Sequence, residues 1–197
     1  AGGVSTEDEA LKKLAPFVAA LYQPMKILQQ ELRISTSAGV ALIPRDGNSL
    51  DILMRRADLA LYSAKHHGPG LVHFFQPSLE ATVKAQAETA QALHLAILNG
   101  EFEAHYQPQF DLWSGEVHGF ESLIRWRHPQ RGFVSPDQFI PVAENTGQIC
   151  QIGNWILRES CERARKWIDE GHGKREMSVN ISVVQLLQAD FHTQVEA

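Results

Sequence analysis

The chain contains no apolar run close to the roughly 18 residues of a membrane-spanning helix, and its first eight residues lack the basic and hydrophobic regions of a signal peptide. It also has no basic excess, because 18 Lys and Arg stand against 23 Asp and Glu, a formal net charge of −5. Binding to a nucleic acid polymer requires the opposite balance. We therefore expect a cytoplasmic chain without a nucleic acid partner, although a longer protein could be anchored through segments outside these residues.

Cysteine is also scarce. Cys150 and Cys161 are the only two, and we expect both on one helix. At 1.5 Å per residue they would lie roughly 16 Å apart, which is too far for a disulfide. We interpret both as reduced thiols without a metal or redox role. The nine histidines show no metal-ligand spacing, and His66 and His67 suit the carbonyl end of a helix.

The remaining composition is that of a folded protein. Hydrophobic residues make up 44% of the chain and charged residues 21%, which excludes disorder and low-complexity classes. A length of 197 residues fits one ordinary domain or two small ones.

The N-terminal third shows the pattern of a βαβ unit. Ser5 and Thr6 precede three acidic residues and an apolar stripe, which predicts a capped helix that ends before Pro24. Apolar residues then keep strand parity from 28 to 42, and Gly39 within them suggests close backbone approach. Helical spacing resumes after Ser49 and continues to residue 67, before a short strand at 71–75.

Residues 77–99 predict a connecting helix between two domains, 1–76 and 100–197. Beyond Gly100, apolar and polar residues alternate through residue 110, and a second strand runs from Val117 to Trp126. Because the turn between these strands is short, they must be antiparallel. A helical region from Ser135 to about residue 170, broken near 146–147, then leads to a third strand at 177–182.

Three residues of the second strand of this hairpin could form a site. Glu121, Leu123 and Arg125 stand at i, i+2 and i+4, so their side chains share one face at steps of roughly 7 Å. A carboxylate and a guanidinium there can serve a metal ion and an anionic ligand, but a structural ion pair fits the same spacing. Asn180 is a polar residue in an apolar run, which fits either a buried amide or a metal ligand.

The second half of the chain resembles the N-terminal part of an EAL domain, the cyclic di-GMP phosphodiesterase family. Five motifs occur in order with matching spacing: Tyr106-Gln107-Pro108, Gly119-Phe120-Glu121-Ser122-Leu123-Ile124-Arg125-Trp126-Arg127-His128-Pro129, Gly132-Phe133-Val134-Ser135-Pro136, Phe139-Ile140-Pro141-Val142-Ala143-Glu144 and Val179-Asn180-Ile181-Ser182. They cover residues from about 88 to 191.

Residues from about 5 to 75 resemble the C-terminal part of a GGDEF diguanylate cyclase domain. The likeness is carried by Ser37-Ala38-Gly39-Val40-Ala41 and by Arg55-Arg56-Ala57-Asp58-Leu59-Ala60-Leu61-Tyr62-Ser63-Ala64-Lys65. The two resemblances imply an α/β fold, in which part of a GGDEF-type α/β sandwich is joined by a helix to the first part of a modified (β/α)8 TIM barrel with an antiparallel first strand.

The EAL resemblance implies roles for five residues. Glu121 would be catalytic and would ligate Mg²⁺ or Mn²⁺, with Asn180 as a second ligand. Gln107, Leu123 and Arg125 would bind cyclic di-GMP. Such a cation neutralises phosphoryl oxygens and acidifies a water molecule, as phosphodiester hydrolysis requires. Glu144 would support the site or cap a helix, and Ser122, which replaces the family's usual Ala, should leave Glu121 in place.

Other features of the two families do not occur in the chain. The later acidic ligands and the lysine of the EAL site are absent, no Gly-Gly-Asp-Glu-Phe run occurs, and Gly68-Pro69-Gly70 stands where Gly-Arg-Asn is usual. Lys65 fits either a triphosphate contact or a solvated helix end. Diguanylate cyclase activity is not expected. Three strands alone would also expose sheet edges and an apolar barrel interior, which favours association.

Two hypotheses follow from these observations. In the first, the chain is part of an enzyme that hydrolyses cyclic di-GMP to linear di-GMP, and is by itself an incomplete catalytic unit. In the second, it is a non-catalytic module that binds cyclic di-GMP or regulates a partner. A homodimer through the EAL part is compatible with both.

Overall fold

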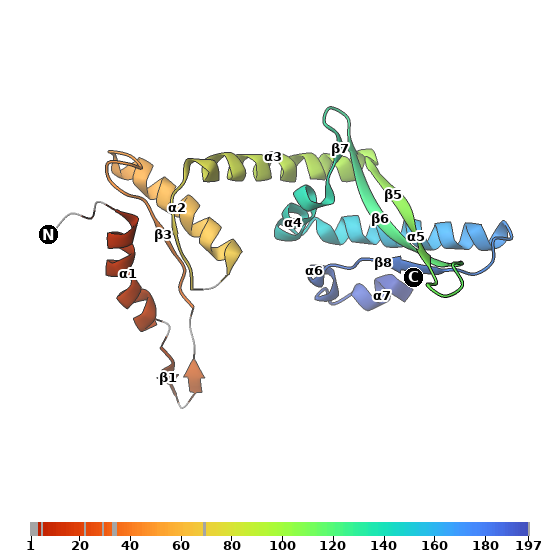
Figure 1. Ribbon diagram of the computed structural model, residues 1–197, viewed down its shortest axis with the longest axis horizontal. Coiled ribbons are helices and arrows are strands. Elements are labelled where there is room, and N and C mark those ends of the chain that lie inside the picture. The colour runs from red at the N-terminus through yellow and green to blue at the C-terminus, as the bar shows by residue number, and fades with distance from the viewer. Residues whose placement is uncertain are drawn as a thin grey trace. The chain divides into compact units, whose positions relative to one another are not determined.

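The structure is a computed structural model, and it describes residues 4, 6–21, 23–28, 30–32, 35–68 and 70–196. The chain divides into two compact units, residues 1–85 and 86–197. Helix α3 (Pro77–Asn99) begins in the first unit and ends in the second (Figure 1).

The first unit is built on a βαβ arrangement. Before α3 it contains α1 (Glu7–Leu21), β1 (Met25–Ile27), β2 (Gln30–Leu32), β3 (Ala38–Val40), α2 (Leu50–His67) and β4 (Val72–Phe74). Strands β3 and β4 pair in parallel, and α2 is the crossover between them. The predicted βαβ unit is thereby confirmed.

Both predicted helices of this unit begin at polar caps. The backbone N–H of Glu9 donates to Thr6 Oγ1 (3.3 Å), and that of Ile52 donates to Ser49 Oγ (3.4 Å). Each bond satisfies an N–H that has no partner within its helix. Helix α1 continues past Pro16 to Leu21. The other predicted cap, at position 5, lies outside the described residues.

Gly39 lies in the middle of β3, where α2 packs directly on the strand. A Cβ atom at this position would be 2.0 Å from Ala57 O and 2.2 Å from Leu61 N, both backbone atoms of α2. Only glycine allows this separation, and the predicted close backbone approach is confirmed.

The stretch from 28 to 42, whose apolar residues keep strand parity, contains two short strands. Strand β2 ends at Leu32 and β3 starts at Ala38, and positions 33 and 34 lie outside the described residues. β2 instead pairs antiparallel with β1, and Leu28, with a φ of 47°, lies in the turn between them. Alternation of apolar residues does not distinguish one long strand from two short ones with different partners.

The second unit contains a long hairpin and two main helices. After α3 come β5 (Phe102–Phe110), β6 (Val117–His128), β7 (Gly132–Val134), α4 (Pro136–Thr146), α5 (Ile149–Asp169), β8 (Glu176–Val179), α6 (Val183–Leu186) and α7 (Phe191–Glu196). The predicted hairpin and the predicted break between two helices are confirmed, since α4 ends at Gly147 in the left-handed conformation. Strand β7 and helices α6 and α7 were not predicted.

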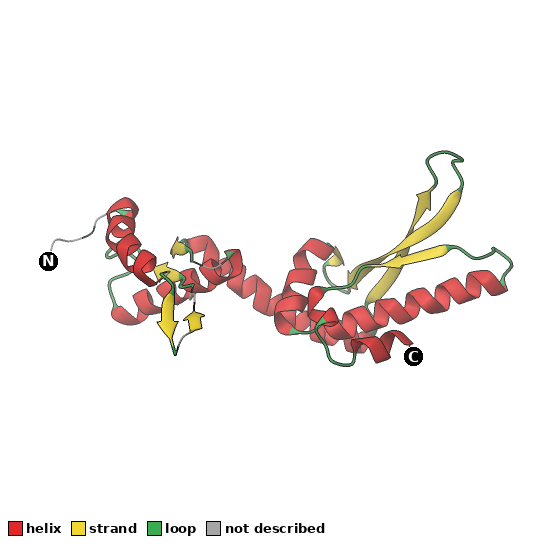
Figure 2. Ribbon diagram, turned by 90° about the horizontal axis from the view of Figure 1, so that it is seen from below, coloured by secondary structure: helices red, strands yellow, loops and turns green. Residues whose placement is uncertain are grey.

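The strands of this unit form one sheet around β6. β5 and β7 pair antiparallel with β6, and β8 pairs in parallel, from Gly119↔Glu176 to Ser122↔Val179. Helix α5 runs alongside the sheet (Figure 2). β5 is thus the antiparallel first strand, and β6 and β8 are the first parallel strands, as predicted for the start of the modified barrel.

The hydrophobic core lies between this sheet and the helices. Trp126 and Phe139 are fully buried, with ring centroids 5.6 Å apart in an edge-to-face arrangement. Phe102 packs against both rings at about the same spacing. From Phe120 to Trp126 the even-numbered residues of β6 face the helices, so the odd-numbered residues Glu121, Leu123 and Arg125 face the opposite side.

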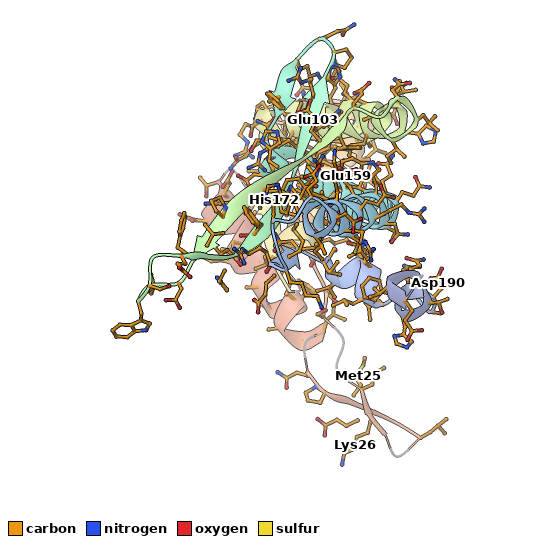
Figure 3. The ribbon with its side chains drawn as sticks, turned by 90° about the vertical axis from the view of Figure 1, so that its right-hand side faces the viewer. Met25, Lys26, Glu103, Glu159, His172 and Asp190 are labelled. Atoms are coloured by element: carbon orange, nitrogen blue, oxygen red, sulfur yellow. The ribbon has the colours of Figure 1, made fainter. Side chains whose placement is uncertain are left out.

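The opposite side of the sheet corrects the expectation of an exposed apolar barrel interior. Strand alternation places Glu103, His105 and Gln107 of β5 there, beside Glu121 and Arg125 of β6. Glu103 is labelled in Figure 3. Leu123 and Phe133 are apolar residues on this face, but most of its side chains are charged or polar, and the larger apolar surface of the sheet is the one covered by helices.

Candidate functional site

The four predicted site residues of the hairpin lie on one face of the sheet. Glu121, Leu123 and Arg125 follow one another along β6 and are half-buried. Gln107 of β5 pairs directly with Glu121, and its side chain is exposed. Directly opposed residues of an antiparallel pair project to the same side, so Gln107 and Glu121 are neighbours.

Asn180 reaches the same place from β8. The sequence predicted that Asn180 is part of this strand. The strand ends at Val179, however, so Asn180 lies just beyond it. Asn180 Nδ2 donates a hydrogen bond to Glu121 Oε1 (2.7 Å). Because β6 and β8 are parallel and Ser122 pairs with Val179, the residue that follows Val179 falls beside this part of β6.

Arg125 lines two neighbouring cavities. The first, of about 320 Å³, is also lined by Leu123, Glu144 and Asn180. The second, of about 440 Å³, is lined by Phe133 as well. Arg125 Nη1 donates to the carbonyl of the preceding residue (2.9 Å), which holds the guanidinium close to its own strand.

A hydrogen-bonded turn holds the segment that carries Asn180. Ser182 Oγ donates to Glu144 Oε1 (2.7 Å) and accepts from the N–H of Val184 (3.2 Å). Gln185 Oε1 accepts from the N–H of Ser182 (3.2 Å), which completes a capping box at α6. The Glu144 carboxylate therefore connects α4 to the turn that follows Asn180.

Ser122 points away from the site. Its side chain is 2% exposed, and its Oγ lies 2.7 Å from the Oγ of Ser160 on α5. The residue adjacent to Glu121 thus contacts the helix layer, on the other side of the sheet from the site.

Two oxygen donors are available to a cation. Glu121 offers a carboxylate and Asn180 an amide oxygen, which are hard ligands of the kind that Mg²⁺ prefers. Within the described part of the chain, no group of three or more His, Cys, Asp or Glu side chains could hold a metal ion. Glu121 and Asn180 are thus the two side chains that could hold a cation here.

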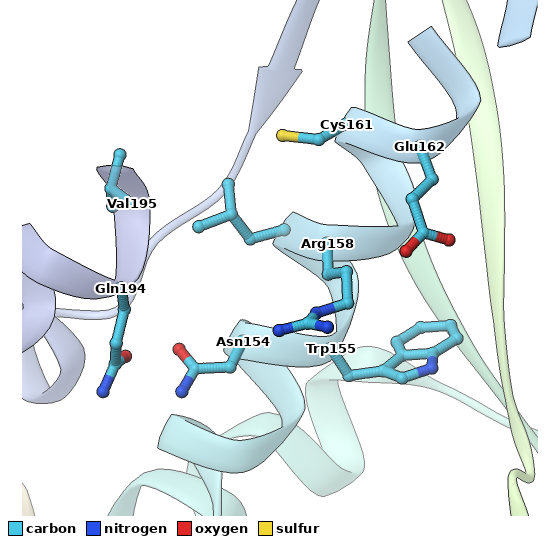
Figure 4. A pocket seen from close by; sticks show the side chains of 8 residues that line it. Asn154, Trp155, Arg158, Cys161, Glu162, Gln194 and Val195 are labelled. Carbon is cyan, nitrogen blue, oxygen red and sulfur yellow. The ribbon is translucent and has the colours of Figure 1, made fainter. Parts of the chain in front are cut away.

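The remaining candidates lie elsewhere. The side chain of Lys65 is exposed, and those of His66 and His67 lie outside the described residues. Cys150 and Cys161 are both on α5 and are free thiols. A cavity of about 560 Å³ between α5 and α7 has Cys161 in its wall and none of the five predicted site residues (Figure 4).

Two residues near the site were missed by the sequence reasoning. Ser178 pairs directly with Glu121, and Ser182 holds the turn after Asn180. Ser178 stands two residues before Asn180, so strand alternation could have found it. The bond between Ser182 and Glu144 joins residues 38 positions apart, and no local pattern signals it.

Among the described helices, none combines the length and the apolar character that crossing a membrane requires.

Two family models match the chain. The EAL domain model matches residues 90–197, more than half of the chain, and the diguanylate cyclase GGDEF domain model matches residues 3–70.

Curated relatives align with most of the chain. The chain is 41% identical over 172 residues to the bifunctional diguanylate cyclase/cyclic di-GMP phosphodiesterase MucR of Pseudomonas aeruginosa, covering 87% of this chain and 25% of MucR. It is 35% identical to the cyclic di-GMP phosphodiesterase PdeR of Escherichia coli, covering 96% of this chain and 28% of PdeR. The chain thus spans about a quarter of the length of these relatives.

Solved structures of EAL proteins also match the chain. The phosphodiesterase of Pseudomonas aeruginosa MucR in complex with c-di-GMP matches with a TM-score of 0.53 and 39% identity, over 55% of this chain and 44% of that chain. The EAL enzyme Bd1971 with cAMP and cyclic di-GMP bound matches with a TM-score of 0.54 and 29% identity, over 77% of this chain and 40% of that chain. The antiparallel first strand and the parallel pairing of β6 with β8 agree with these matches. The chain therefore belongs to the EAL domain family, and it carries a GGDEF-type segment before the EAL segment.

Proposed function

We propose that this chain forms part of a cyclic di-GMP phosphodiesterase, an enzyme that hydrolyses cyclic di-GMP to linear di-GMP. The observation that carries the proposal is the 2.7 Å contact between Asn180 Nδ2 and Glu121 Oε1, which brings an oxygen-bearing side chain of β6 together with one that follows β8. The names of MucR and PdeR, and the c-di-GMP in the MucR structure, support the substrate class.

Glu121 and Asn180 would hold one Mg²⁺ or Mn²⁺ ion. When bound, the ion neutralises the phosphoryl oxygens and lowers the pKa of a water molecule. The donor set fits a single such ion, because Mg²⁺ is commonly bound by one or two protein ligands while water and phosphate fill the other positions. A pair of ions would need further carboxylates.

Gln107, Leu123 and Arg125 would bind the dinucleotide. All three share the face of the sheet that carries Glu121. Arg125 lies where two cavities meet, and its guanidinium can bind a phosphate or the edge of a guanine. Gln107 is placed to hydrogen bond to a ligand that lies over Glu121. The family resemblance implies that the substrate is a bacterial signalling molecule of the cytoplasm. We therefore propose that this part of the protein lies in the cytoplasm.

A second function is favoured by one observation. Because no group of three or more His, Cys, Asp or Glu side chains in the described residues could hold a metal ion, the chain could bind cyclic di-GMP without cleaving it. Such a module would regulate a partner through the bound dinucleotide.

Calorimetric titration of cyclic di-GMP into the full chain, with and without Mg²⁺, tests both functions. We expect micromolar binding that weakens by about tenfold or more in Glu121→Gln and Arg125→Ala. Arg165→Ala is the matched control, because Arg165 is an exposed cation on α5 that pairs with Asp169.

Chromatography of the titrated mixture separates the two functions. Linear di-GMP that disappears in Glu121→Gln supports hydrolysis, whereas binding without product supports the regulatory module. Equal affinity of the folded wild-type chain and both site variants would contradict the assigned roles.

A further inference from the structure

The tip of the β5–β6 hairpin presents two large apolar side chains to solvent. Trp113 is 98% exposed and Leu112 is 95% exposed, and Phe110 at the end of β5 is 55% exposed. Single exposed apolar residues are common on protein surfaces, but adjacent bulky ones at the end of a projecting hairpin suggest contact with another molecule.

The tip is held in one conformation. Asp111 Oδ1 accepts from the N–H of Trp113 (3.0 Å), from the N–H of Ser114 (2.8 Å) and from Ser114 Oγ (3.0 Å). These bonds also lower the pKa of Asp111, so its carboxylate is charged at neutral pH. A preorganised tip loses little conformational freedom when it binds.

A small apolar cavity lies at the same end of the sheet. It has a volume of about 330 Å³, which can accept an indole ring. Its lining residues come from the start of β6, the end of α5 and the loop after α5: Val117, Phe120, Trp167, His172 and Arg175. The loop after α5 and the hairpin tip lie on the same side of the unit in Figure 2, and His172 of this loop is labelled in Figure 3.

The tip and the cavity carry opposite charge. Asp111 and Glu116 flank Trp113, whereas Arg175 borders the cavity and Lys174 precedes it in the sequence; His172 at the rim already faces Glu170, with 3.7 Å between Nε2 and Oε2. Arg175 Nη1 contacts the backbone carbonyl of Lys174 (3.3 Å), and the exposed guanidinium can bind a further acceptor.

We propose that this end of the second unit binds a second copy of the chain, with Trp113 of each copy entering the cavity of the other. Trp113 and Val117 are four residues apart, so each copy offers both parts of the contact at one place. That arrangement suits a two-fold, self-complementary interface. Glu116 of each tip then faces Arg175 at the cavity of the other copy.

The area involved indicates a weak dimer. A Trp side chain buries up to about 250 Å². With Leu112 and the cavity walls of both copies, the contact falls near the lower limit of specific interfaces, which is about 1,200 Å² in total. Dimerisation should therefore depend on concentration. Anionic lipid is a less suitable partner, because Asp111 and Glu116 would be repelled from it.

Sedimentation velocity of the full chain over a wide concentration range tests the proposal. We expect a reversible monomer–dimer equilibrium that weakens by about tenfold or more in Trp113→Ser. Leu187→Ser is the matched control, because Leu187 is 80% exposed in the same unit but lies after α6, away from the hairpin. Neither side chain is buried, so thermal unfolding should not change.

A charge exchange identifies the interface. Arg175→Glu should weaken the dimer, and adding Glu116→Arg should restore it. A monomer at every concentration, or a dimer that Trp113→Ser leaves intact, would overturn the proposal. Co-sedimentation with phosphatidylcholine–phosphatidylglycerol vesicles tests whether the tip binds anionic lipid instead. A chain that stays monomeric and needs Trp113 to bind these vesicles would also overturn the proposed dimer.

Discussion

Ser122 and Ser160 form a hydrogen-bonded pair whose two members should respond differently to truncation. Their Oγ atoms lie 2.7 Å apart, and Ser160 Oγ also lies 2.6 Å from the carbonyl oxygen of Ile156. A hydroxyl has one proton and a carbonyl can only accept, so both contacts form together when Ser122 donates to Ser160 and Ser160 donates to Ile156. Both side chains are almost completely buried.

The magnitudes follow from which group loses its partner. Ser160→Ala leaves the Ser122 hydroxyl buried without the one side-chain partner that it has among the described residues, which should cost about 1–3 kcal/mol of unfolding free energy. Ser122→Ala leaves Ser160 bonded to Ile156, so the change should stay within about 0.5 kcal/mol. In the double variant no hydroxyl remains unpartnered, and it should be more stable than Ser160→Ala alone.

Urea unfolding followed by tryptophan fluorescence measures these differences. All four tryptophans lie between residues 113 and 167, so the signal reports the second unit alone. The midpoint should shift while the slope with denaturant stays constant. The reasoning would be refuted if Ser122→Ala were as harmful as Ser160→Ala, or if the double variant combined both losses.

Three further substitutions test the packing. Gly39→Ala should cost about 3 kcal/mol in thermal or urea unfolding of the first unit, because its Cβ would meet backbone atoms of α2 at 2.0 Å; an unchanged midpoint would contradict this packing. Burial acts to raise the pKa of Asp46, but hydrogen bonds from Arg45 and the backbone outweigh it and lower that pKa. The Asp46 carboxylate therefore stabilises the folded state above its unfolded pKa of about 3.9, and this stabilisation is lost as pH falls through the lower folded pKa. Asp46→Asn should lower the free energy of unfolding at pH 7, and the loss should become smaller as the pH falls. Gly153→Ala should destabilise, because its Cβ would lie 2.0 Å from Gln185 Nε2, yet stabilise by about 0.5–1 kcal/mol in a Gln185→Ala background, where alanine only favours the helix. The same sign in both backgrounds would refute that contact.

Much of the fold could be predicted because its signals are local. The Ser49 cap, the helical spacing after it and the short turn between the hairpin strands each determine structure within a few residues. Strand parity also places Glu121, Leu123 and Arg125 on one face. The site residues remain a proposal, but the structure brings Asn180 to Glu121.

What could not be predicted depends on partners far away in the sequence. Alternation does not reveal that β2 pairs with β1, or that Asn180 falls after its strand has ended. The polar face of the sheet was also missed, because a barrel interior was expected to be apolar. Its charged residues, such as Glu103, are visible in the sequence, but their common face becomes evident only once the register is known.

The position of Asn180 relative to Glu121 depends on a contact at the other end of the β6–β8 pairing. A Cβ atom on Gly119 would lie 2.9 Å from Glu176 O and 3.0 Å from Glu176 Cβ, so β8 approaches β6 more closely than a larger residue would allow. The ladder that starts there ends at Ser122↔Val179, one residue before Asn180. A slip of one residue would turn the side chains of β8 to the opposite face and move Asn180 away from Glu121. Gly119, two positions before Glu121, therefore helps to bring Asn180 to Glu121, the proposed pair of metal ligands.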